Sequence, residues 1–184
     1  DAFPATVGSI CEIECINTEN TTAEIIGFRN NKNLIAMHRT DNNVRIGSKV
    51  KLINDGVNIS VGDDLLGRVL DGMGEPLDGK YKISSNENWP LYGKTINPLQ
   101  RKKVDSEFDV GVRSINSLMT IGRGQRIGII AGSGVGKSIL LQMMSKYSVA
   151  DVVVVGLIGE RAREVKTMVE TLTKFDENNK IIIV

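Results

Sequence analysis

The stretch RIGIIAGSGVGKSILLQMMSKYS, residues 126–148, decides the fold class of this chain. Residues 126–131 are mostly apolar and predict a short strand, whereas residues 137–148 repeat apolar side chains at the spacing of a helix. Glycine-rich sequence joins these two elements. A strand that passes through such a turn into a helix is typical of loops that bind phosphate groups in α/β domains.

The turn AGSGVGKS, residues 131–138, matches the pattern G-x-x-x-x-G-K-[ST] at its last three positions and has Ala131 in place of the first glycine. Glycines leave the backbone N–H groups free to face phosphate oxygens, and the helix adds the positive end of its dipole. We expect Lys137 to contact the β- and γ-phosphates and Ser138 to bind Mg²⁺. The predicted nucleotide-binding residues are Ala131, Gly132, Ser133, Gly134, Val135, Gly136, Lys137, Ser138 and Ile139.

The residues after this helix continue the α/β pattern. DVVVVGLI, residues 151–158, is an apolar run typical of a parallel strand covered on both faces. Residues 161–174 predict a helix with one apolar stripe, and a further strand begins at Ile181. The order βαβαβ predicts half of a doubly wound α/β domain.

Two charged residues follow the second predicted strand, at the sheet edge where α/β domains bind their ligands. Glu160 is placed to orient and polarise an attacking water molecule, and Arg161 to stabilise charge on a transferred phosphoryl group. The alternative is a glutamate favoured by the dipole of a helix N-terminus, followed by a solvated arginine. We favour the catalytic interpretation for both residues.

The first third of the chain has a different character. Short apolar segments alternate with turn sequences such as NNK, DNN and NDG about every ten residues, which predicts a small antiparallel barrel or sandwich over residues 1–66. Residues 67–105 predict a linker with a tight hairpin at 67–79, followed by an irregular connecting segment. Residues 106–184 then form the start of the nucleotide-binding core.

Composition excludes several classes of protein. The formal net charge is +1, so no overall field favours nucleic acid or an anionic membrane surface. No apolar run reaches the roughly 18 residues of a membrane span. Cys11 and Cys15 have no second pair of ligands with which to form a zinc site, and the only histidine is His38. A cytosolic protein is the expectation.

Three segments carry a resemblance to a known family: GRVLDGMGEPLDG (67–79), DVGVRSINSLMTIGRGQRIGIIAGSGVGKS (109–138) and ADVVVVGLIGERAREV (150–165). They resemble the catalytic subunits of rotary ATP synthases and, more closely, the type III secretion ATPases, in particular their flagellar protein export branch. The resemblance covers nearly the whole chain. Ala162 stands where the export ATPases commonly have glycine, a change that the first turn of a helix tolerates.

The resemblance implies a RecA-like P-loop core preceded by a six-stranded β-barrel and followed by a helical domain that engages substrate. It implies Mg-dependent ATP hydrolysis by a homo-hexamer that energises protein export. The catalytic residues implied are Lys137, Glu160 and Arg161, with Ser138 on Mg²⁺. Implied partners are export substrates, chaperones, and stator-like and export-gate proteins, at a cytoplasmic location peripheral to the membrane export apparatus, without nucleic acid.

By the same resemblance, the opening barrel strand is absent from this chain, and the later-strand aspartate, the arginine finger and the adenine-stacking aromatic follow Val184. The chain would then be a fragment that turns ATP over poorly by itself, because one arginine finger contributes about 10³- to 10⁵-fold in rate.

Other functions fit the residues less well. A virulence injectisome ATPase is the nearest alternative. A rotary ATP synthase subunit would normally carry GGAGVGKT at the loop. A terminator-type RNA helicase needs aromatic residues in its barrel to stack on bases, and residues 1–65 contain only Phe3 and Phe28. A noncatalytic ring subunit would usually lack the glutamate found at position 160.

Overall fold

The computed structural model describes residues 3–16, 19–38, 44–54, 58–84, 87–91, 93, 95–132, 134–176 and 179–184. The chain divides into two compact units, Asp1–Ile59 with Asn88–Lys94, and Ser60–Glu87 with Thr95–Val184. None of the helices in these ranges is both long enough and apolar enough to span a membrane. The division at residues 66 and 105 remains a prediction.

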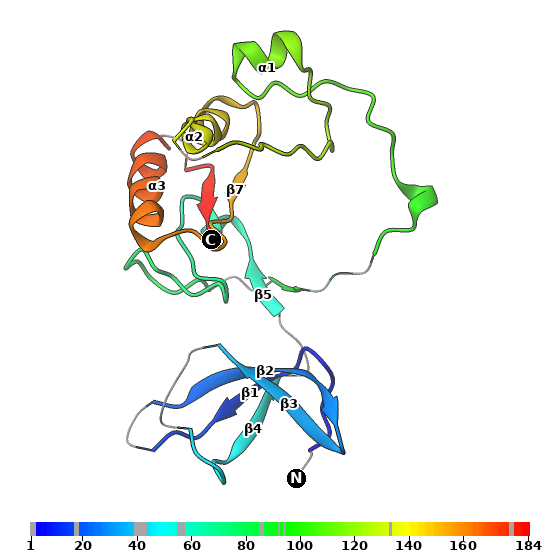
Figure 1. Ribbon diagram of the computed structural model, residues 1–184, viewed down its shortest axis with the longest axis vertical. Coiled ribbons are helices and arrows are strands. Elements are labelled where there is room, and N and C mark those ends of the chain that lie inside the picture. Colours follow the sequence, from blue (N-terminus) through cyan, green and yellow to red (C-terminus); the bar gives the residue numbers. More distant parts are fainter. Residues whose placement is uncertain are drawn as a thin grey trace. The chain divides into compact units, whose positions relative to one another are not determined.

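The first unit contains a four-stranded antiparallel sheet (Figure 1). Its strands are β1 (Ile10–Ile13), β2 (Thr21–Arg29), β3 (Lys32–Met37) and β4 (Val50–Asn54), in the order β3-β2-β1-β4. Asn30 and Asn31 form the two-residue turn between β2 and β3, both with positive φ, which asparagine tolerates better than other non-glycine residues. The short antiparallel strands expected in the first third of the chain are therefore confirmed.

The core of this unit lies on one face of the sheet. Cys11 and Ala23 are fully buried and Ile13 is 4% exposed, with Phe3, Ile35, Val44 and Val50 packed against them. Burial raises the pKa of the Cys11 thiol, because a thiolate is poorly solvated in an apolar core. Cys11 therefore acts as a small apolar residue, as its position in an alternating strand predicts.

The expected barrel is not closed in the part of the chain that the structure describes. Closure requires every edge strand to pair, and β3 and β4 are both edges of the four-stranded sheet. The next strand, β5 (Asn58–Val61), pairs instead with β6 (Glu87–Pro90), so it does not extend the sheet past β4. The sequence pattern identified the strands but not their closure.

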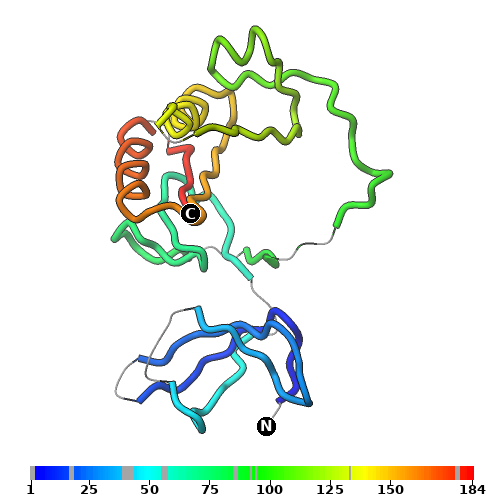
Figure 2. Tube along the Cα trace, in the orientation of Figure 1, coloured from blue at the N-terminus to red at the C-terminus, as the bar shows by residue number. Residues whose placement is uncertain are grey.

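The second unit contains three α-helices among its described residues, α1 (Arg113–Leu118), α2 (Lys137–Tyr147) and α3 (Ala162–Phe175), together with strands β7 (Val153–Val155) and β8 (Ile181–Ile183). Two short 3₁₀ helices, η1 (Asp63–Leu65) and η2 (Pro98–Gln100), precede them. The trace in Figure 2 shows residues 95–112, in green, as a long connection that leads into α1. The helices at 137–148 and 161–174 are confirmed to within one residue at each end.

Strands β7 and β8 are parallel, with Val153 opposite Ile181 and Val155 opposite Ile183. All three β8 residues are buried, and Leu172 of α3 covers them at 2% exposure. Met168 and Val169 pack against the same cluster, so the predicted apolar stripe of α3 does face the core. Burial on both faces explains why β8 is a continuous apolar run.

A third parallel segment, residues 68–70, lies on the other side of β8. Val69 is bridged in parallel to Ile183, the Leu70 N–H donates to the Ile183 carbonyl at 2.8 Å, and the Ile183 N–H donates to the Arg68 carbonyl at 3.0 Å. The chain then turns back, because Leu70 is bridged to Pro76 and the Leu77 N–H donates to the Val69 carbonyl. The predicted hairpin is confirmed, and its first arm also belongs to the sheet.

The predicted strand at residues 126–131 is wrong for this structure. None of these residues lies in a strand, and Ile127 and Ile130 are 45% and 100% exposed. A strand needs a hydrogen-bonding neighbour, and within the described residues β7 pairs only with β8, which pairs on its other side with residues 68–70. The βαβαβ order therefore lacks its first strand here.

A second apolar cluster joins α1 to α2. Val110, Val112, Ile115 and Ile121 are buried, and Leu140 and Met144 of α2 pack against them. Gly111 lies so close to α2 that a Cβ atom on it would stand 2.4 Å from the Tyr147 carbonyl carbon and oxygen. Its φ of +73° also disfavours any side chain.

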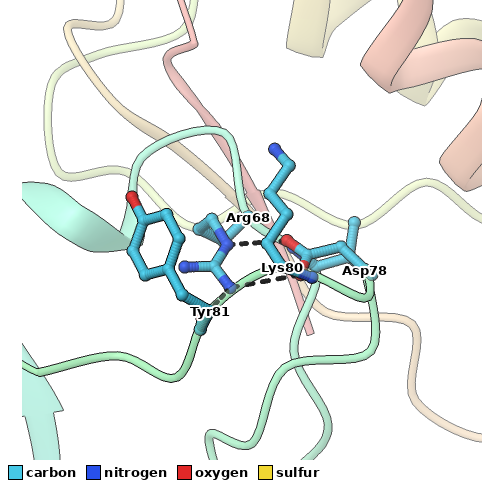
Figure 3. A network of polar contacts seen from close by, with 5 residues as sticks. Arg68, Asp78, Lys80 and Tyr81 are labelled. Atoms are coloured by element: carbon cyan, nitrogen blue, oxygen red, sulfur yellow. Dashed lines mark hydrogen bonds and ion pairs between the residues drawn. The ribbon is translucent and has the colours of Figure 1, made fainter.

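A buried ion pair ties the two arms of the 67–79 hairpin together (Figure 3). Arg68 Nε donates to Asp78 Oδ2 at 2.6 Å and Nη2 donates to Oδ1 at 3.1 Å, with the two side chains 3% and 9% exposed. Nη2 also donates to the Tyr81 carbonyl at 2.8 Å, and the guanidinium lies 4.9 Å from the Tyr81 ring centroid. The hydrogen bonds from Arg68 lower the pKa of Asp78 to about 2.

Substituting Gly111 tests the close approach to α2. We expect Gly111→Ala to lower the free energy of unfolding by about 1–3 kcal/mol more than Gly124→Ala does, because its Cβ overlaps the backbone of Tyr147. Gly124 is the matched control, with φ +82° and open space around its Cβ position. Urea unfolding measures both. Equal losses would contradict the close packing of α1 against α2.

The depressed pKa of Asp78 predicts a specific dependence of stability on pH. The ion pair stabilises the native state above the unfolded carboxyl pKa of about 4, and this contribution is lost as the pH falls towards about 2. The stability difference between wild type and Asp78→Asn should therefore shrink between pH 5 and pH 2 in chemical denaturation. The control Glu75→Gln removes an exposed ion pair from the same hairpin. Its partners, Lys82 and Glu75, are 76% and 57% exposed. Because exposed pairs contribute little, the free energy of unfolding of Glu75→Gln should stay close to that of wild type at every pH.

Candidate nucleotide-binding site

The loop before α2 has the backbone that phosphate binding requires. Gly134 and Gly136 have φ values of +77° and +95°, and nothing lies within 4 Å of a Cβ position at Gly132, Gly134 or Gly136. Gly136 is the N-cap of α2, and no side chain of a described residue caps the helix. The first N–H groups of α2 are therefore open to an anion, with the helix dipole behind them. Ser133 lies outside the described residues.

The charged side chains predicted for catalysis are exposed. Lys137 begins α2, whereas Glu160 and Arg161 lie between β7 and α3. None of the three side chains forms a hydrogen bond or ion pair with a residue that the structure describes. They are free to contact a ligand.

Main-chain hydrogen bonds hold the segment that leads from β7 to Glu160 in place. The Val184 N–H donates to the Val155 carbonyl at 2.9 Å, and the Leu157 N–H donates to the Val184 carbonyl at 2.7 Å. The chain turns at Gly159, with φ +72°, and the Arg161 carbonyl accepts hydrogen bonds from the N–H groups of Glu164 and Val165 at the start of α3. Glu160 therefore lies just past the carboxyl end of a parallel strand, where α/β domains bind their ligands.

A cavity of about 550 Å³ brings the two predicted halves of the site together. Ser138 and Ile139 of α2 line it from one side, and Glu160 lines it with residues of α3. Residues 153–155 of β7 also line it. Lys137 and Arg161 do not line this cavity, although each is next in sequence to a residue that does.

Comparison with known proteins also indicates a nucleotide-binding domain. Residues 111–184 match the family model of the ATP synthase alpha/beta family, nucleotide-binding domain. The flagellum-specific ATP synthase of Buchnera aphidicola subsp. Baizongia pistaciae is 44% identical over 96% of this chain and 41% of its own length. That of Pseudomonas aeruginosa is 43% identical over 94% of this chain and 39% of its own length.

A solved structure supports these matches. The assembled ATPase EscN from the type III secretion system of enteropathogenic E. coli superposes with a TM-score of 0.82 at 34% identity, over 100% of this chain and 44% of EscN. The chain is a homologue of the flagellum-specific ATP synthases and of EscN over nearly its whole length. It spans about two fifths of the length of the curated relatives it matches.

The match to the nucleotide-binding domain and the superposition on EscN support the expected nucleotide-binding core with an antiparallel sheet before it. The core observed here is a partial one, since the segment that enters the loop, residues 126–131, has no paired neighbour among the described strands. Ala131, in place of the first glycine of the loop pattern, is exposed and leaves the positive-φ positions Gly134 and Gly136 unaffected.

Several polar residues that line the cavity were not identified from the sequence. They are Gln142, Ser145, Arg163, Glu164 and Thr167. A signal was present, because Ser138, Gln142 and Ser145 follow one another at i, i+4 and i+7 on one face of α2. Glu160, Glu164 and Thr167 repeat nearly the same spacing into α3. These polar residues share a mostly apolar cavity with Leu141 of α2 and with Met168 and Leu172 of α3.

The donors present fit a magnesium ion that also binds phosphate. Among the described residues no group of three or more His, Cys, Asp and Glu side chains could hold a metal. Ser138, on the first turn of α2 and at the cavity, supplies one hydroxyl oxygen. Mg²⁺ characteristically takes one or two protein ligands and completes its shell with phosphate oxygens and water. The site thus suits Mg²⁺ delivered with a nucleotide.

Arg113 is the first residue of α1. It is exposed and forms no ion pair with any residue in the described ranges. Its position at a helix N-terminus, where a positive charge opposes the dipole, gives no reason for it to be there.

Proposed function

We propose that the whole protein is the Mg-dependent ATP-hydrolysing subunit of a homo-hexameric ring that energises flagellar type III protein export. The observation that carries this proposal is the cavity shared by Ser138, at the uncapped N-terminus of α2, and Glu160, past the end of β7. A phosphate loop alone indicates binding. A carboxylate on the same cavity provides a group that can act on water.

The residues divide into binding and catalytic roles. The N–H groups of residues 132–139 and the Lys137 ammonium hold the phosphates of ATP, with Ile139 at the cavity wall. Ser138 holds Mg²⁺, which when bound neutralises developing charge on the phosphates. Glu160 orients a water molecule and accepts its proton, and Arg161 stabilises negative charge on the phosphoryl group.

The flagellar assignment rests on the matched relatives. Flagellum-specific ATP synthases from several bacteria are 37–44% identical to this chain, whereas the structurally similar EscN is 34–35% identical. An injectisome ATPase is the second candidate, because EscN itself comes from such a type III secretion system and superposes over the entire chain.

We further propose that the N-terminal sheet is part of a closed barrel in the whole protein, and that residues 1–66, 67–105 and 106–184 are its barrel, linker and core. The proposed location is the cytoplasm, peripheral to the membrane export apparatus. Proposed partners are export substrates, chaperones, and stator-like and export-gate proteins. EscN has been solved in complex with its central stalk EscO, which supports a ring that binds other proteins of the apparatus.

Two substitutions separate binding from catalysis in the full-length protein. We expect Lys137→Ala to weaken ATP binding and abolish hydrolysis, and Glu160→Gln to retain ATP binding while lowering kcat by about 10²- to 10⁴-fold. Fluorescent-nucleotide titration measures binding, and phosphate release measures kcat. Lys166→Ala and Glu170→Gln are matched controls, because this exposed pair on α3 is outside the cavity. Normal turnover in Glu160→Gln would remove Glu160 from its proposed role.

Ring formation predicts how activity depends on concentration. If active sites are completed between subunits, specific ATPase activity of the full-length protein should rise steeply with protein concentration and then reach a plateau as rings fill. Sedimentation and activity measured at the same concentrations provide the check. Specific activity that is constant while the protein is monomeric would contradict a shared site.

A further inference from the structure

The buried Arg68–Asp78 pair is outside the nucleotide cavity, and the proposed function leaves it without a role. Arg68 Nε and Nη2 donate to Asp78, and Nη2 also donates to the Tyr81 carbonyl, whereas Nη1 is buried and has no hydrogen-bond partner among the residues that the structure describes (Figure 3). A buried charge pair is costly to desolvate, and an unpaired buried donor adds to that cost. Stability alone therefore does not explain this buried ion pair, and its geometry points to a role in aligning the two arms of the hairpin.

Asp78 holds the first arm of the hairpin at two adjacent points. Its Oδ2 atom accepts from Arg68 Nε at 2.6 Å and from the Val69 N–H at 3.3 Å. Its Oδ1 atom also accepts the Lys80 N–H at 3.0 Å, which fixes the carboxylate in its own turn. The planar fork of arginine permits one alignment of the two arms, because both of its hydrogen bonds must be made together.

The arm that is held in this way is the segment paired with β8. Arg68 and Leu70 exchange main-chain hydrogen bonds with Ile183, and Val69, 9% exposed, packs in the core beside Leu172. A shift of one residue would turn Val69 out of the core and put a neighbouring residue in its place. The alignment of residues 68–70 therefore determines the register in which this segment pairs with β8.

The path from β8 to the proposed catalytic glutamate is short. Val184, directly after β8, is hydrogen-bonded to Val155 at the end of β7 and to Leu157 beyond it. Glu160 follows three residues later. Residues 68–70, β8 and the end of β7 thus form one hydrogen-bonded layer, with the ion pair at one edge and the Glu160 segment at the other.

We propose that Arg68 and Asp78 are positioning residues that set the register of residues 68–70 on β8 and thereby the position of the Glu160 segment. The catalytic consequence rests on the proposed function, since it needs Glu160 to act on water. The register itself is independent of that function and is measured separately.

The first measurement is amide hydrogen exchange by NMR on wild type, Asp78→Asn and Arg68→Lys. We expect the Leu70, Ile183 and Leu157 N–H groups to exchange about 10-fold faster or more in both variants, because their hydrogen bonds open more often. The Ile25 N–H, bonded to the Ser9 carbonyl in the first unit, should be unchanged. Glu75→Gln, the same chemical change at the exposed pair of this hairpin, is the matched control.

The second measurement is steady-state ATP hydrolysis by the full-length variants below their unfolding temperatures. We expect kcat to fall by about 10- to 100-fold with KM within about 2-fold, because the Glu160 segment is displaced while the phosphate loop is not. Glu75→Gln should match wild type. Arg68→Lys keeps the positive charge but loses the planar fork, so it can be used for the same measurement if Asp78→Asn fails to fold.

The outcomes are distinct. Unchanged exchange at Leu70 and Ile183 would overturn the register role. Faster exchange with unchanged kcat and a lower unfolding temperature would reduce the pair to a structural role and overturn the positioning of Glu160. If the full-length wild type hydrolyses no ATP, the proposed function fails, and the exchange data still decide whether the pair sets the register.

Discussion

Strand β8 is hydrogen-bonded on both sides, and the second unit is organised around that pairing. Ile181–Ile183 pairs with β7 on one edge and with residues 68–70 on the other, and α3 covers it through Leu172. The entry to the strand is fixed as well, because the Asp176 carboxylate accepts the Lys180 and Ile181 N–H groups at 2.8 Å. A segment from the first half of the chain is thereby built into the nucleotide-binding sheet.

This pairing places the candidate site. The end of β7 is held by Val184, so the turn that carries Glu160 begins from a rigid edge. Across the cavity, α2 is anchored at its other end, where the Lys180 ammonium donates to the carbonyls of Ser148 and Ala150. Ser138, at the start of α2, and Glu160 thus line one cavity from two segments that hydrogen bonds hold in place.

Much of this could be predicted from the sequence, because local patterns determined it. The helical period of residues 137–148 and 161–174, the asparagine turn at Asn30–Asn31 and the glycines of the phosphate loop each act over a few neighbouring residues. The strand predicted at 126–131 shows the limit of that approach. Its apolar residues have strand character, but a strand exists only where a neighbour accepts its hydrogen bonds.

The sequence by itself determined the class of domain, the loop proposed to hold phosphate and the choice of Glu160 as the candidate catalytic residue, because each is encoded within a short window. Only the tertiary structure decided that residues 68–70 join β8, that the described N-terminal strands leave an open sheet, and that Ser138 and Glu160 line one cavity. These features depend on pairing between segments about 110 residues apart or on separate helices, and no local pattern specifies which partner a strand edge or helix face will meet.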